Sequence, residues 1–173
     1  HFQFGKTAAG VDIAFWGTGF KMNASSTNTN GWQSSRMRGT ICPAFLAALP
    51  TEWQNVIASC TKYTDNKGGG SDTASNVTST PDKIWLLSEF EVRGTRSSAN
   101  SAEQNYQKQY DYYKNGNSKI KYKHTAQTTA CTWWLRSPYA ANSKYFCVAS
   151  SGLNSYYPES SDPLGFAPGF MVA

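Results

Sequence analysis

The chain has 173 residues, a length that suits one domain with a single buried core. Hydrophobic residues make up 39% of the chain and aromatic residues 14%, so it carries too many large apolar side chains to remain disordered. The net charge of +5 is modest, and the basic residues are too dispersed to indicate a nucleic-acid partner. Only 16% of the residues are charged, whereas Ser, Thr, Asn, Gly and Tyr are abundant, as on extracellular and adhesive surfaces.

The sequence contains no apolar run long enough to span a bilayer, so we expect no membrane insertion. It begins at His1 without a signal peptide or an initiator methionine. We therefore expect a mature fragment, or one domain of a larger surface or virion protein.

The cysteines fit no metal-binding template, because they form no C-x-x-C pair and have no histidine at ligand spacing. Two disulfides are one interpretation, with three possible connectivities, and buried free thiols are the other. The residues concerned are Cys42, Cys60, Cys131 and Cys147.

One strand and two helices are predicted in the first third of the chain. Residues 11–16 alternate between apolar and polar side chains, which predicts a strand. Asn30 can cap a helix over residues 31–37. Pro50 suits the first position of a second helix, because its missing N–H group costs nothing there. Four apolar residues then recur at helical spacing and predict the buried stripe of that helix: Trp53, Val56, Ile57 and Cys60.

Residues 62–81 are mostly Thr, Ser, Asp, Asn and Gly, and they include the run Gly68-Gly-Gly70. Such a segment is poor in core-forming side chains, so we expect an exposed hairpin or a mobile loop. Its Asp65, Asn66 and Asp72 lack the regular oxygen spacing of a calcium-binding loop, and no metal site is predicted.

Residues 83–92 form the most apolar stretch, in which residues 85–87 predict a buried strand or turn. Glu89 and Glu91 follow closely and would share one face of a strand. Paired carboxylates can serve in acid–base catalysis. We favour a solvated strand edge, or structural pairing with Arg93 or Arg136, over a catalytic role.

Two aromatic and basic patterns precede the C-terminal region. Tyr106, Tyr110 and Tyr113 recur at helical spacing, so a helix and an aromatic-rich loop are both open. In residues 119–123 three lysines alternate with Ile120 and Tyr122. We interpret this segment as a solvated or edge strand rather than a nucleic-acid groove.

The last third of the chain has two apolar ends and a polar interior. Residues 133–138 (Trp-Trp-Leu-Arg-Ser-Pro) and residues 165–172 look like fixed framework, and Trp133, Trp134 and Phe146 are predicted core residues together with Phe170. Between the two ends lies a run of Tyr, Ser, Ala, Asn and Pro. Tyr offers a large contact area at low entropy cost and Ser and Asn adapt their hydrogen bonds, as in antibody binding loops.

The motifs WWLRSP, Phe146-Cys-Val148 and Gly165-Phe-Ala-Pro-Gly-Phe170 resemble the C-terminal signature of a bacterial and phage domain family of unassigned activity. That family resembles the C-type lectin fold in the version shared with formylglycine-generating enzymes. It is also similar to the variable proteins of diversity-generating retroelements, in which a mutagenic reverse transcriptase rewrites adenines near the end of the gene. The resemblance implies an α+β fold of short helices on a small, mostly antiparallel sheet, with paired N- and C-terminal strands, over one domain spanning residues 1–173.

Randomised adenines in AAY codons yield Asn, Ser, Tyr, Ala, Asp, Leu, Pro, Phe and several others, but never Lys, Glu, Gln, Met or Trp. Most residues between 139 and 166 belong to this permitted set, whereas Lys144 and Glu159 do not. We therefore expect a non-enzymatic domain that binds a protein or glycan on a cell surface, without a cofactor, a metal or a nucleic acid. The predicted ligand-binding residues are Tyr139, Ala140, Asn142, Ser143, Tyr145, Ser155, Tyr156, Tyr157, Ser160, Ser161, Asp162, Leu164 and Phe166.

Two alternatives stay open. One is a surface or glycan-binding adhesion module of the same fold that is not diversified. The other is a formylglycine-generating oxidase, which needs a reactive cysteine pair; Cys131 and Cys147 do not match that active site in spacing or surroundings. We place the domain outside the cell, on a bacterial surface or a phage virion.

Overall fold

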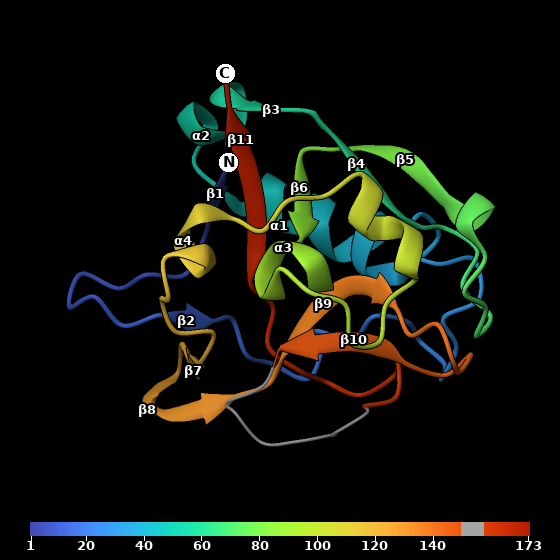
Figure 1. Ribbon diagram of the computed structural model, residues 1–173. Coiled ribbons are helices and arrows are strands. Elements are labelled where there is room, and N and C mark those ends of the chain that lie inside the picture. Colours follow the sequence, from blue (N-terminus) through green and yellow to red (C-terminus); the bar gives the residue numbers. More distant parts are fainter. Residues whose placement is uncertain (150–157) are drawn as a thin grey trace.

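The computed structural model describes residues 1–149 and 158–173 and has an α+β fold of short helices and small sheets (Figure 1). The predicted α+β class is therefore confirmed. All strand pairs among the described residues are antiparallel except β2 with β7. The strands are β1 (Phe2–Gln3), β2 (Ile13–Ala14), β3 (Ile57–Ala58), β4 (Cys60–Asp65), β5 (Val77–Asp82), β6 (Ile84–Leu86), β7 (Lys121–Lys123), β8 (Ala126–Cys131), β9 (Trp133–Pro138), β10 (Phe146–Ala149) and β11 (Pro168–Val172). The α-helices are α1 (Cys42–Ala48), α2 (Thr51–Val56), α3 (Glu89–Arg93) and α4 (Asp111–Lys114).

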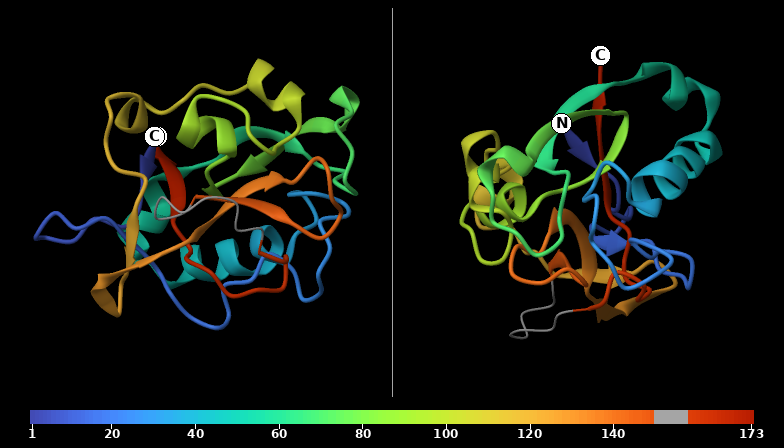
Figure 2. Two further views of the ribbon diagram at one scale, coloured as in Figure 1. Left: turned by 60° about the horizontal axis from the view of Figure 1, so that its bottom comes forward. Right: turned by 90° about the vertical axis from the view of Figure 1, so that its right-hand side faces the viewer.

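The C-terminal strand β11 lies at the centre of the main sheet and pairs with β1, β3 and β6. Phe2 of β1 lies opposite Phe170, so the two ends of the chain come together, as Figure 1 shows. Gly169 lies opposite Trp85, and a Cβ atom at Gly169 would come within 2.9 Å of the indole nitrogen. The right-hand view of Figure 2 shows α1 and α2 on one side of β11, and α3 on the other.

Strand β9 separates two parts of the hydrophobic core. Trp134 packs in one cluster with Phe146 and Phe170, whereas Trp133 and Leu135 pack in the other. All five side chains are buried, so the prediction that both tryptophans, Phe146 and Phe170 are core residues is confirmed. The alternation of side chains along β9 explains why consecutive tryptophans serve two clusters.

The polar segment after Ile57 forms the hairpin β4–β5, in register from Cys60 opposite Asp82 to Asp65 opposite Val77. The hairpin is confirmed, but the expectation that it is exposed is wrong, because one of its faces packs against β9. Lys62 and Thr80 are each only 4% exposed.

The N-terminal helices differ from the prediction. Residues 31–34 form turns instead of a helix, with Asn30 and Gly31 at φ 68° and 56°. A π-helical turn over Met37–Ile41 then leads into α1. Helix α2 does follow Pro50, but it ends at Val56, where the chain passes into β3. The predicted stripe is therefore wrong: Ile57 is buried, whereas Trp53 and Val56 are 43% and 41% exposed.

The middle of the chain also differs in part. Residues 89–93 form helix α3 rather than a strand, because Ser88 and Glu91 make a reciprocal capping box at its start. The three tyrosines do not share one helix. Tyr106 directly follows a 3₁₀ turn over Ser101–Asn105, Tyr110 precedes helix α4, and Tyr113 lies within it. Strand β7 lies between β2 and β8, so it is not an edge, and Lys121 is buried.

Candidate ligand-binding face

The connection from β9 to β10 is the loop of residues 139–145, which we call the display loop. Strands β9 and β10 pair antiparallel with an irregular register between Phe146 and Val148. The loop closes through a backbone hydrogen bond from Tyr139 to Tyr145 of 3.0 Å, and the two rings lie 6.2 Å apart. Ser143 is exposed, and the two tyrosines are half-buried. The loop thus presents aromatic and small polar side chains to solvent.

Asn28 fixes the backbone of the display loop from outside it. Its side chain is fully buried, and its Oδ1 accepts a hydrogen bond from the backbone of Gly69 at 2.8 Å. Its backbone N–H donates to the carbonyl of Ser143 at 2.6 Å. The two hydrogens of its amide are shared among three loop carbonyls, those of Tyr139 (3.2 Å), Asn142 (2.9 Å) and Tyr145 (2.7 Å). One side chain therefore ties both ends and the middle of the loop together.

The three glycines 68–70 all have positive φ angles, and they lie against Asn28 or the display loop. A Cβ atom at Gly68 would lie 2.0 Å from the backbone oxygen of Asn28, and one at Gly70 would lie 3.1 Å from the backbone of Asn142. The glycine run therefore serves close backbone packing beneath the display loop, a role that its composition did not predict.

A second segment, residues 158–162, lies beside the display loop. Ser160 is fully buried and donates both its backbone N–H, at 3.0 Å, and its hydroxyl to the carbonyl of Lys144. Glu159 forms a bridge with Tyr145, and its carboxylate accepts a hydrogen bond from the hydroxyl of Ser26. The side chains of Glu159, Ser161 and Asp162 are half-exposed. We define the binding face as Tyr139, Ala141, Asn142, Ser143, Lys144, Tyr145, Glu159, Ser161 and Asp162.

The structure corrects the predicted site at four positions, whose side chains are buried. Phe166 is fully buried, because its backbone pairs with Phe15 and its ring stacks on Phe20 at 5.2 Å. Leu164 bonds through its backbone to the carbonyl of Phe20 and packs in the same cluster. The remaining two are Ala140, at 8% exposure, and Ser160.

Six predicted residues lie on the binding face: Tyr139, Asn142, Ser143, Tyr145, Ser161 and Asp162. Ala141, Lys144 and Glu159 join them, although none of the three is in the list of predicted ligand-binding residues. Three further predicted residues, Ser155, Tyr156 and Tyr157, lie outside the described residues.

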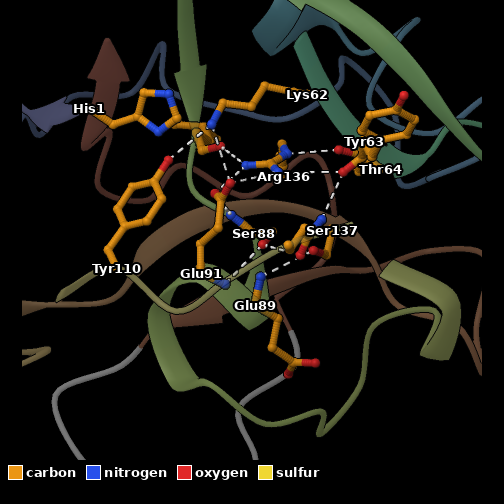
Figure 3. Close-up of polar contacts among 12 residues, drawn as sticks. His1, Lys62, Tyr63, Thr64, Ser88, Glu89, Glu91, Tyr110, Arg136 and Ser137 are labelled. Atoms are coloured by element: carbon orange, nitrogen blue, oxygen red, sulfur yellow. Dashed lines mark hydrogen bonds and ion pairs between the residues drawn. The ribbon is translucent and has the colours of Figure 1, made fainter. Parts of the chain in front are cut away.

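A buried ionic network supports the strand that carries the display loop (Figure 3). Arg136 of β9 is fully buried and forms two hydrogen bonds with Glu91, of 2.5 and 3.1 Å. Lys62 lies 3.3 Å from the same carboxylate, so two cations share one anion. Burial by itself raises the pKa of Glu91, but Arg136 and Lys62 outweigh it and lower that pKa to about 2. The predicted pairing with Arg136 is confirmed, and the solvated-edge interpretation of Glu91 is wrong.

Two other buried carboxylates position the end of β9. Glu103 accepts a hydrogen bond from the hydroxyl of Ser137 at 2.6 Å, and burial raises the pKa of Glu103 to about 7. Glu89 accepts hydrogen bonds from the backbone N–H groups of residues 97–99. Residue Ser98 of that loop in turn accepts a hydrogen bond from the backbone of Ala140, at 2.9 Å. The base of the display loop is thus fixed from both sides.

All four cysteines are free thiols, so of the two interpretations left open by the sequence the structure has the free thiols; Cys42, Cys131 and Cys147 are buried and Cys60 is half-buried. Burial raises the pKa of Cys131 to about 11 and raises that of Cys147 as well. Within residues 1–149 and 158–173, no group of three or more acidic, His or Cys side chains is placed to hold a metal ion. In the same ranges, no helix has the length and apolar character needed to cross a membrane.

The family model described as a domain of unknown function (DUF6273) matches residues 13–173, and the chain belongs to this family. Comparison with curated proteins and with solved structures gave no match. The match leaves out β1 but covers all the other strands, the ionic network and the binding face.

Proposed function

We propose that the domain binds a ligand without catalysis, through the binding face at the β9–β10 turn. One observation carries the proposal: the display loop carries tyrosines and small polar side chains, and its backbone is held by buried residues elsewhere in the chain. Asn28 and Ser160 make these contacts, and neither has a side chain on the face. A loop that is ordered before binding loses less conformational entropy when a ligand binds.

The chemistry of the face fits recognition of a protein or glycan surface. Tyr139 and Tyr145 offer amphipathic rings, and Ser143 and Asn142 offer small polar groups. Lys144 and Asp162 add charges of both signs. Such a mixture supports contact with a polar partner, with the tyrosines as the main anchors.

We further propose that the domain has a C-type lectin-like scaffold and is the variable protein of a diversity-generating retroelement, displayed on a phage or bacterial surface. The pairing of β1 with β11, with short helices and small antiparallel sheets, supports the scaffold. The separation of the binding face from the buried core supports diversification, because substitutions at exposed face positions leave the packing of the core unchanged. Lys144 and Glu159 lie outside the set that mutagenesis of AAY codons yields, so their codons are expected to be fixed or different.

Binding to cell surfaces and to a glycan array tests the role of the face. The labelled domain is compared with a Tyr139→Ser, Tyr145→Ser double variant and with Tyr122→Ser, a half-buried control tyrosine in β7. We expect saturable binding by the wild type that chelators do not affect, its loss in the double variant, and its retention in the control. Binding that survives the double substitution, or that is lost in the control, would refute the assignment of the face.

A further inference from the structure

Lys121 of β7 is a buried cation without a matching anion. It is only 3% exposed, and among the described residues its ammonium group forms no hydrogen bond or ion pair. Its closest recorded contact is with the ring of Trp133, whose centroid lies 5.1 Å from Nζ. The ammonium nitrogen is not fully enclosed, although the rest of the side chain is buried. A cation in such a place is open to an anionic ligand.

Lys121 lines a cavity of about 780 Å³ on the side of the molecule that carries β1 and α4. Figure 1 shows these elements at the end opposite the turn between β9 and β10, so the cavity is separate from the binding face. Its volume is in the range that holds a small organic ligand.

Aromatic rings form much of the cavity wall. Tyr63 and Tyr106 stack at 4.5 Å with nearly parallel planes, and Tyr112 and Tyr113 meet edge to face at 5.2 Å. Such rings offer apolar surface to the body of a ligand and polar edges to its substituents.

The other charges of the cavity also leave it positive, because two cations share one anion. Lys62 and Arg136 share the carboxylate of Glu91, and Lys6 lies 3.2 Å from Asp12. Lys108 and Asp111 also line the cavity, and these two exposed side chains carry opposite charges. Lys121 adds a further positive charge that has no ion pair among the described residues, and burial lowers its pKa to about 8 despite the field of Asp12. An anion beside it would supply the missing partner.

We propose that this cavity binds a small organic anion, with its acidic group on Lys121 and its apolar body against the tyrosine rings. This site is independent of the binding face, and either proposal can fail without the other.

The probe is anilinonaphthalene sulfonate, which joins aromatic rings to one sulfonate and fluoresces when bound. The full chain is titrated as wild type, as Lys121→Met and Lys121→Gln, and as Lys123→Met. Lys123 is a matched control in the same strand, because it lies over the ring of Trp16 and does not line the cavity. We expect saturable binding at one site, weakened at least about tenfold by either Lys121 substitution and unchanged in the control.

A neutral probe separates charge recognition from apolar binding. Phenylnaphthylamine has the same ring system without the sulfonate, and we expect it to bind the wild type at least about tenfold more weakly. It should bind the wild type and both Lys121 variants equally. Equal binding of the two probes by the wild type, undiminished binding of the sulfonate by both folded Lys121 variants, or no saturable binding would overturn the proposal.

Discussion

The buried amide of Asn28 donates a hydrogen bond of 2.7 Å to the carbonyl of Tyr145, which lies 117 positions further along the chain. The same amide reaches the carbonyls of Tyr139 and Asn142. The shape of the display loop is therefore set by a residue from another part of the sequence.

Replacing Asn28 by Ala should loosen the display loop. The change removes the amide that donates to three loop carbonyls, and the side chain of Ala can donate to none of them, so we expect the free energy of unfolding to fall by about 1–3 kcal/mol. Backbone amides of residues 139–145 should also exchange faster with deuterium. Urea unfolding and hydrogen exchange measure the two effects, with exposed Thr29→Ala as the neighbouring control. An unchanged exchange rate in the loop would show that Asn28 does not hold it.

Face and core positions should differ sharply in their tolerance of substitution. Phe166→Ala should cost about 3–5 kcal/mol, because a fully buried ring is removed from a stack with Phe20. Ser143→Tyr should change stability by no more than about 0.5 kcal/mol, because Ser143 is exposed. Thermal and urea unfolding of the two variants measure this contrast. Equal losses of stability would contradict the division of residues 139–166 into exposed face positions and buried core positions.

Replacing Glu91 by Gln should destabilise the fold by about 3–5 kcal/mol, because Lys62 and Arg136 then remain buried without an anion. The substitution Glu52→Gln, at an exposed position, is the control. The pKa of Glu91 is lowered to about 2 in the folded state, below the usual value of 4.5. Its contribution to stability is therefore present above pH 4.5 and is lost as the pH falls toward 2. Urea midpoints unaffected by the substitution would refute the role of the network.

Glu103 should act on stability in the opposite direction. Burial raises its folded-state pKa from 4.5 to about 7, so its contribution is complete below pH 4.5 and is lost as the pH rises through 7. Glu103→Gln cannot titrate, and its stability should fall less than that of the wild type between these pH values. Urea midpoints measured across this range provide the comparison. Parallel curves for the two proteins would rule out the shift.

Removing the charge of Lys121 should stabilise the domain when no anion is bound. Its pKa is lowered from 10.5 to about 8, so keeping it protonated at pH 7 costs about 1–3 kcal/mol. Lys121→Met should therefore unfold at a higher temperature than the wild type at pH 7. The difference should shrink as the pH rises from 8 to 10.5, because the unfolded wild type then loses the same proton. A less stable variant at pH 7 would contradict an unpaired charge.

Local patterns predicted the core of the C-terminal region well. Trp133, Trp134 and Phe146 are large apolar residues in strand-like sequence, and all three are buried. The pairing of Glu91 with Arg136 was predicted as one option among others, because both are charges beside an apolar stretch. The burial of Phe166 was not predicted, since it depends on a bridge to Phe15 from the other end of the chain.

The residues that hold the backbone of the display loop could not be predicted from the sequence either. Asn28 stands in a polar loop, and nothing local distinguishes it from Asn23 in the same loop. The run Gly68-Gly-Gly70 was the one available signal, because three glycines permit a close backbone approach as readily as mobility. Both roles rest on contacts between distant segments, which composition and periodicity do not encode.

The most direct test of a diversified binding face is the DNA around the gene. We predict a near-copy of the segment encoding residues 133–172 beside a reverse-transcriptase gene, differing only at adenines of the copy. Those differences should fall in the codons of face residues such as Tyr139, Ser143 and Tyr145, and should spare Trp134 and Phe166. A near-copy whose differences fall on buried positions, or the lack of any such copy, would contradict diversification and leave a domain with a fixed partner.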